Sequence, residues 1–151
     1  MAHDKFVYVT FIRTTPDKLW DALTKPEFTR EYWFGVVHES DWKRGSAWKM
    51  IYPDGRVTDS GEVLEADRPR RLVLKWRNEF RPELRAEGFS RCVFELETAG
   101  ETVKLTITHT IDCDNSKLIE AVSGGWPKVL SNLKSLLESG RALDIPHVRA
   151  A

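Results

Sequence analysis

The sequence predicts an α+β fold in which a curved antiparallel sheet of six to seven strands wraps around a long C-terminal helix. Residues 36–111 read almost throughout as strands, and two short helical patterns follow an earlier strand-like run. The last third carries an apolar stripe at three- and four-residue steps, made of Val129, Leu130, Leu133, Leu136 and Leu137. The concave face of the sheet is the one partner large enough to bury this stripe. Such an arrangement often leaves a cavity between helix and sheet.

The first strand is expected at residues 6–13, which are rich in β-branched and aromatic side chains. Thr15 can then cap a helix, and Pro16 suits its first position. Pro26 ends that helix and begins a second short one, which stops at Gly35. Two short helices therefore follow the first strand.

The remaining strands are separated by clear turn signals. They are expected at residues 36–39, 46–52, 56–66, 71–77, 89–98 and 102–111. Along residues 102–111 apolar residues alternate with Lys and Thr, so one face is buried and the other solvated. The polar residues 78–88 are the longest expected loop.

The C-terminal helix is expected to begin at the Gly-Gly-Trp-Pro sequence of residues 124–127. A short helical segment at 117–122 leads into this break. The helix that follows has about 13 residues and a length of about 20 Å, which suits a position across the sheet. Residues 141–151 have weak periodicity and are expected to fray.

Length and charge narrow the classes of function. The chain has 151 residues, enough for one domain over 1–151 with a core at about 6–140. Basic and acidic residues each number 23, and this neutral balance argues against nucleic acid as a partner. No apolar run is long enough to span a membrane, and the N-terminus does not look like a signal peptide, so we expect a cytoplasmic protein.

Nothing in the sequence predicts a metal or another cofactor. The two cysteines, Cys92 and Cys113, and the four histidines have no ligand spacing, and both thiols are expected to be free. No nucleophile or phosphate-loop motif occurs either, so no catalytic residue is assigned. Whether the protein is an enzyme stays open, with the balance toward a protein that is not.

Several segments resemble the homologues of the activator of the heat-shock-protein-90 ATPase. The first part of the match is residues 12–24 together with Pro26-Glu27-Phe28 and Tyr32-Trp33. A second is the Gly61-x-Val63 strand, which leads through Pro69 to Trp76. The most specific part is the block at 124–140, which begins with Gly-Gly-Trp-Pro. The likeness covers nearly the whole chain.

This resemblance implies the helix-grip fold of the START-like (SRPBCC) superfamily, which includes lipid-transfer domains, aromatase/cyclases and pollen-allergen-like proteins. The fold hosts carriers, enzymes and protein-binding domains, so it does not define a function. The eukaryotic co-chaperone that names the family has an additional N-terminal domain. We do not expect that domain here, and its activity is not carried over.

Two polar residues on inward-facing patterns are candidates for chemistry. His109 lies on the apolar face of its strand, where it is either a hydrogen-bonded core histidine or a group that binds a ligand or moves a proton. Asp59 shares a strand face with Val63 and would be a pocket carboxylate if that face pointed inward. Because an unpaired buried Asp is rare, we expect Asp59 at an exposed edge.

The abundance of aromatic residues, with six tryptophans, is the remaining signal. They either fill the core or line a cavity that binds an apolar or aromatic small molecule. The candidate cavity residues are Trp33, Trp48, Met50, Trp76, Phe94, His109, Trp126, Leu130 and Leu133.

Three functions compete at this point. The first is a single-domain binder of a hydrophobic or amphipathic small molecule. The second is a protein-interaction module with a chaperone-like partner, and the third is a cyclase- or hydratase-like enzyme that uses the same cavity. A monomer and a homodimer are both compatible with the sequence.

Overall fold

The computed structural model describes residues 4–146, which form a seven-stranded sheet and its covering helices. The elements in chain order are β1 (Asp4–Ile12), α1 (Pro16–Thr24), α2 (Pro26–Tyr32), β2 (Val37–Ser40), β3 (Ala47–Ile51), β4 (Val57–Asp67), β5 (Arg71–Asn78), α3 (Pro82–Arg85), β6 (Ser90–Ala99), β7 (Thr102–Ile111) and α4 (Lys117–Ser139). The strand order is β1-β7-β6-β5-β4-β3-β2, and every neighbouring pair is antiparallel.

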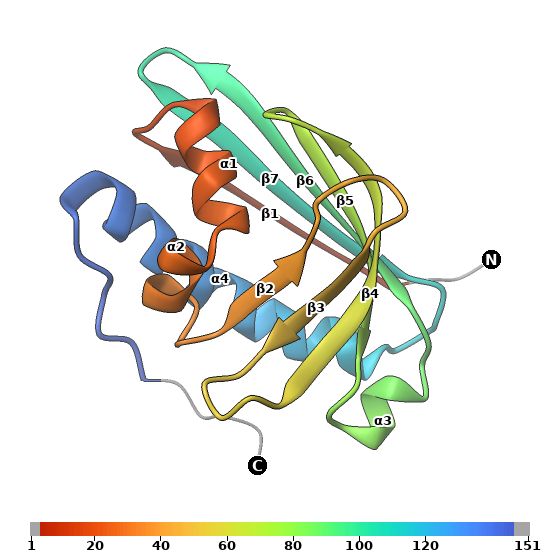
Figure 1. Cartoon of the computed structure of the whole chain (residues 1–151). Helices are drawn as coiled ribbons and strands as arrows, with labels where there is room; N and C mark the ends of the chain where they lie inside the picture. Colours follow the sequence, from red (N-terminus) through yellow and green to blue (C-terminus); the bar gives the residue numbers. More distant parts are fainter. Residues whose placement is uncertain (1–3, 147–151) are drawn as a thin grey trace.

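The helix α4 lies within the curve of the sheet, which confirms the predicted fold class (Figure 1). Its C-terminal part is tied to β1 and the residue just after it. Lys134 Nζ donates to the carbonyl of Phe11 at 2.6 Å, and Glu138 accepts from the backbone N–H of Arg13 at 2.8 Å. The helix α2 packs against both α4 and β2, so the two short helices close one end of the curve.

The alternation along the strands is confirmed by their burial. In β7 every second residue from Val103 to Ile111 is buried, and the residues between them are partly exposed. Each observed strand lies within about two residues of its predicted bounds. The expected loop at 78–88 contains one short helix, α3.

The prediction that α4 begins at the Gly-Gly pair is wrong. One continuous helix of 23 residues runs from Lys117 through Gly124, Gly125 and Pro127 to Ser139. Glycine and proline weaken a helix locally, by about 1 and 3 kcal/mol per residue. Burial of the apolar face on the sheet offsets this cost, because tertiary packing rather than propensity provides most helix stability.

A glycine in the middle of the sheet allows two tryptophans to meet. Gly61 on β4 pairs with Trp48 on β3 and with Trp76 on β5. The two indole rings approach across it, with centroids 4.7 Å apart. A Cβ atom at Gly61 would lie 1.7 Å from the carbonyl oxygen of Lys75, so no other residue fits this position without moving the strands.

None of the helices within residues 4–146 is long and apolar enough to cross a membrane.

Candidate functional site

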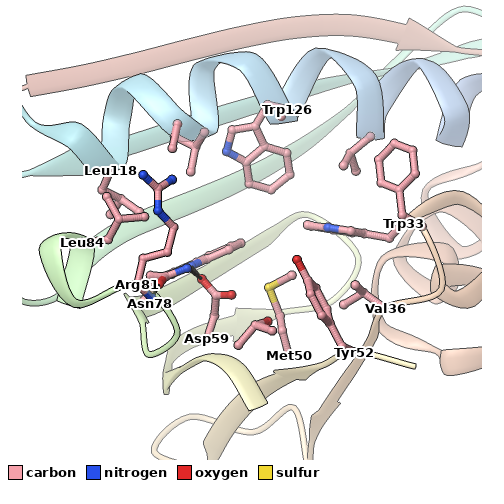
Figure 2. A pocket seen from close by; sticks show the side chains of 17 residues that line it. Trp33, Val36, Met50, Tyr52, Asp59, Asn78, Arg81, Leu84, Leu118 and Trp126 are labelled. Atoms are coloured by element: carbon pink, nitrogen blue, oxygen red, sulfur yellow. Dashed lines mark hydrogen bonds between the residues drawn. The ribbon is translucent and has the colours of Figure 1, made fainter. Parts of the chain in front are cut away.

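A cavity of about 250 Å³ lies between α4 and the inner face of β3, β4 and β5. Figure 2 shows it, with Trp126 above, Trp33 at one end and Leu84 and Leu118 at the other. The loop that contains α3 supplies Arg81 at this second end. The cavity is therefore formed where the helix, the sheet and the 79–88 loop come together.

The helix contributes one continuous face. The residues of α4 that line the cavity are Leu118, Ala121, Val122, Gly125, Trp126 and Val129. They recur at three- and four-residue steps, as expected of one side of a helix. A Cβ atom at Gly125 would meet nothing within 4 Å, so the absence of a side chain there leaves space in the cavity.

The sheet contributes a row of three paired residues. Met50 on β3 lies opposite Asp59 on β4, which in turn lies opposite Asn78 on β5. All three line the cavity, together with Trp76. The row places one carboxylate among apolar and aromatic side chains.

Asp59 is the polar centre of the cavity, with only 8% of its surface exposed. Its Oδ2 atom accepts from Trp76 Nε1 at 2.7 Å and from Asn78 Nδ2 at 3.4 Å. Burial raises the pKa of Asp59 to about 6, the hydrogen bond from Trp76 opposes this rise, and the nearby charge of Glu79 adds to it. The group is thus mostly ionised at neutral pH but titrates close to it.

The expectation that Asp59 lies at an exposed edge is wrong. β4 lies between β3 and β5 and is not an edge strand. Alternate residues of a strand share a face, so Asp59 and Gly61 lie on the same inner face as the buried Val63. The indole N–H of Trp76 supplies the partner that makes burial possible.

His109 is fully buried and lies behind the cavity wall, where both ring nitrogens are engaged. Nδ1 accepts from Trp126 Nε1 at 3.2 Å, so the proton is on Nε2, which is 2.8 Å from Ser90 Oγ. The Ser90 hydroxyl donates onward to the carbonyl of Trp76. Burial lowers the pKa of His109 to about 3, so the ring is neutral. This arrangement is that of a hydrogen-bonded core histidine.

His38 is a second buried histidine, for which no role was predicted. Its Nδ1 accepts from Trp48 Nε1 at 3.0 Å, and its ring lies 4.5 Å from that of Trp33 in an edge-on arrangement. Burial lowers the pKa of His38 to about 3. Three indole N–H groups of the inner face, those of Trp48, Trp76 and Trp126, therefore donate to ionisable side chains.

The structure brings together four of the nine predicted cavity residues. Trp33, Met50, Trp76 and Trp126 line the cavity. The other five are buried in the packed core beside it, and they are Trp48, Phe94, His109, Leu130 and Leu133.

Tyr52, Asn78 and Arg81 also line the cavity and were not predicted as site residues. Asn78 organises the loop, because its Oδ1 accepts from the backbone N–H groups of Phe80 and Arg81 at 3.0 and 2.7 Å. Asn78 directly follows the strand predicted at 71–77, and an Asn at such a place is a common turn signal.

Metal ligands do not gather in the described part of the chain. Within residues 4–146 no three His, Cys, Asp or Glu side chains are placed to hold an ion. Cys92 and Cys113 are free thiols. Burial raises the pKa of the Cys92 thiol well above its ordinary value, so this thiol is unreactive.

Solved structures with the same fold come from several organisms. The protein MLL2253 from Mesorhizobium loti has a TM-score of 0.76 and 22% identity, over 89% of this chain and 97% of that one. The Aha1 dimer from Colwellia psychrerythraea has a TM-score of 0.74 and 18% identity, over 92% and 99% of the two chains. An HSP90 activator from Plasmodium falciparum has a TM-score of 0.72 and 22% identity, over 88% and 95%.

The comparison with functionally curated proteins gave no match. The model of the family described as "Activator of Hsp90 ATPase homolog 1-like protein" matches residues 13–138, which is most of the chain. Together with the helix-grip architecture, this match shows that the chain belongs to the family of Hsp90 ATPase activator homologue 1-like proteins.

Proposed function

We propose that this protein binds a small, mostly apolar molecule in the cavity between α4 and the sheet. Family and fold support either a ligand-binding module or a module similar to Hsp90 activators. The observation that favours ligand binding is the cavity itself, with a volume of about 250 Å³ and walls of tryptophan, methionine and aliphatic side chains. Such a lining is typical of small-molecule sites.

The size of the cavity supports this proposal. Protein interiors are close-packed, so an apolar hollow of this size is space that side chains would otherwise fill. A larger side chain on α4 would reduce it, yet one of the α4 residues that line it is Gly125, where a Cβ atom would meet nothing within 4 Å. A glycine in a helix costs about 1 kcal/mol relative to alanine. Space for a ligand gives a reason for keeping a glycine there.

The test compares two leucine substitutions one residue apart. Gly125→Leu places a side chain into the cavity, whereas Gly124→Leu places one on the exposed side of the same helix, where a Cβ atom also meets nothing within 4 Å. Both remove a helical glycine, so neither is expected to lower the melting temperature. The neutral dye N-phenyl-1-naphthylamine, whose emission rises in apolar sites, serves as the probe.

We expect the wild type and Gly124→Leu to bind the dye with similar affinity and to lose tryptophan emission on binding. Gly125→Leu should bind at least about tenfold more weakly, because its side chain occupies the apolar volume. Equal binding by all three proteins would place the dye elsewhere and contradict the proposal.

A second candidate, a protein-interaction module, is favoured by the outer face of β1. Val7, Val9 and Phe11 are 47%, 44% and 48% exposed there and form an apolar stripe on an edge strand. If this stripe contacts an Hsp90-type chaperone, the protein should raise the chaperone's ATPase rate, and Val9→Asp should remove the increase. An unchanged rate with the wild type would exclude this candidate.

A further inference from the structure

We infer that the ligand carries a protonated amine, which pairs with Asp59 while its apolar body lies against the tryptophans. This inference rests on the proposed function, because it identifies the chemical class that the same cavity would take. The cavity holds one buried negative charge, and no positive group in the described part of the chain balances it.

The carboxylate of Asp59 lacks a counter-charge. Within residues 4–146 no lysine, arginine or histidine nitrogen lies within ion-pair distance of it. The groups that hydrogen-bond to it are neutral: Trp76 and Asn78 both donate to Oδ2, and the neighbouring Thr58 hydroxyl also favours the ionised form. A buried carboxylate is costly unless it is paired, so a cation at this position would be bound strongly.

The surroundings keep the floor of the cavity negative. His38 and His109 lie close by but are held neutral, since burial lowers the pKa of each to about 3. The charge of Glu79 is near enough to raise the pKa of Asp59 slightly, although the Glu79 carboxylate is itself paired with Arg77 and Arg85. The residues of α4 that line the cavity are all uncharged. No neighbouring element therefore supplies the missing positive charge at the floor.

The aromatic walls suit a cation as well. Trp33, Trp76 and Trp126 line the same small volume, with ring centroids of neighbouring pairs 5.3 and 5.9 Å apart. Indole rings attract ammonium groups electrostatically, and this attraction is larger in sites that exclude water. The walls can thus hold both an apolar body and the methylene groups beside an amine.

Arg81 defines the alternative, a ligand with a carboxylate. Its guanidinium group lies at the end of the cavity near Leu118, on the side of the α3 loop (Figure 2). It is 43% exposed and contacts Glu83 at 3.4 Å, so it already has a partner and access to water. An anion held there would also face Asp59, which would repel it. The buried carboxylate of Asp59 therefore determines the charge of the ligand more strongly than the exposed guanidinium group of Arg81.

The test uses three probes with the same aromatic body, namely 2-phenylethylamine, 2-phenylethanol and phenylacetate. Their affinities for the full chain are measured by isothermal titration at pH 7.5. We expect the amine to bind at least about tenfold more tightly than the alcohol, because a hydrogen bond between two charged groups is stronger than one with a neutral donor. Phenylacetate should bind most weakly, because its charge has the same sign as that of Asp59. Asp59→Asn keeps the shape of the side chain and should bring the amine-to-alcohol ratio close to one. Lys104→Ala, on the solvated face of β7, is the control and should leave the ratio unchanged.

Measuring the affinities of the amine and the alcohol over a series of pH values distinguishes direct pairing with Asp59 from a purely structural role of this residue. The amine should lose affinity as the pH falls below about 6, where Asp59 becomes protonated while the ligand stays charged. The alcohol should show no such decline.

The possible outcomes separate the two claims. If the alcohol or phenylacetate binds as tightly as the amine, or if Asp59→Asn keeps the amine preference, the amine inference is wrong and the cavity remains a binding site. If every probe binds Gly125→Leu as tightly as it binds the wild type, the proposed function is wrong. The inference about the amine is then wrong as well.

Discussion

At the scale of single residues, Asp59 shows how a buried ionisable group links function to stability. Its pKa is raised to about 6 in the folded protein by burial, above its ordinary value of 3.8. The folded state therefore holds a proton more tightly than the unfolded chain does. As the pH rises from about 4 through 6, this group makes folding progressively less favourable. A binding partner with a positive charge would reverse that effect.

The first prediction follows from this sign. Asp59→Asn removes the ionisation and should stabilise the protein by about 1–3 kcal/mol at pH 7.5, with a much smaller effect at pH 4. Urea denaturation of both proteins at the two pH values measures the difference, in which the contributions of other groups cancel. A variant that is less stable than the wild type at pH 7.5 would show that the charged form is the better accommodated one.

At the scale of elements, Trp126 is the residue that holds α4 in the curve of the sheet. The indole is 3% exposed, donates to His109 and packs edge-on against Trp33, Trp76 and Phe94. It occupies the stretch of the helix that two glycines and a proline weaken. Its burial therefore provides stability where the helix itself provides least.

The second prediction concerns this anchor. Trp126→Ala should lower the free energy of unfolding by about 3–5 kcal/mol, as large-to-small changes in a packed core do. Lys128→Ala, two residues away on the exposed side of α4, should change it by less than about 0.5 kcal/mol. A loss below about 1 kcal/mol for Trp126→Ala in chemical denaturation would mean that the indole does not anchor the helix.

At the scale of the whole molecule, the two buried histidines dominate the response to acid. His38 and His109 have pKa values lowered by burial from 6.5 to about 3 in the folded state. Below pH 6.5 the unfolded chain binds protons that the folded protein excludes. Stability is therefore present above about pH 6.5 and is lost as the pH falls toward 3.

The third prediction is a pH profile of stability. The free energy of unfolding should decline by about 2–3 kcal/mol between pH 7 and pH 5, because the loss from two histidines exceeds the opposite contribution of Asp59. Denaturation at half-unit pH steps records this profile. A profile that stays flat across this interval would mean that the imidazoles are protonated in the folded protein.

The architecture could be predicted because each strand has one apolar and one polar face, and because the stripe on α4 required a sheet to cover it. The continuity of α4 through Gly124 and Pro127 could not, since local propensity opposes it and tertiary packing decides. The burial of Asp59 could have been predicted from the sequence, because Asp59 shares a strand face with the buried Val63. The residues of the site were predicted less well. The walls of the cavity depend on how the 79–88 loop packs against α4, and this packing cannot be predicted from the spacing of residues along the chain.

The central claim is that a ligand occupies the cavity lined by Trp33, Trp76 and Trp126 and not another part of the molecule. The indole N–H signals in a ¹H–¹⁵N NMR spectrum test it most directly, because the six tryptophans are reporters spread over the chain. On titration with 2-phenylethylamine, the signals of these three residues should shift together with one dissociation constant, while those of Trp20 and Trp42 stay in place. Shifts confined to Trp20 and Trp42, or no shifts at all, would contradict the account.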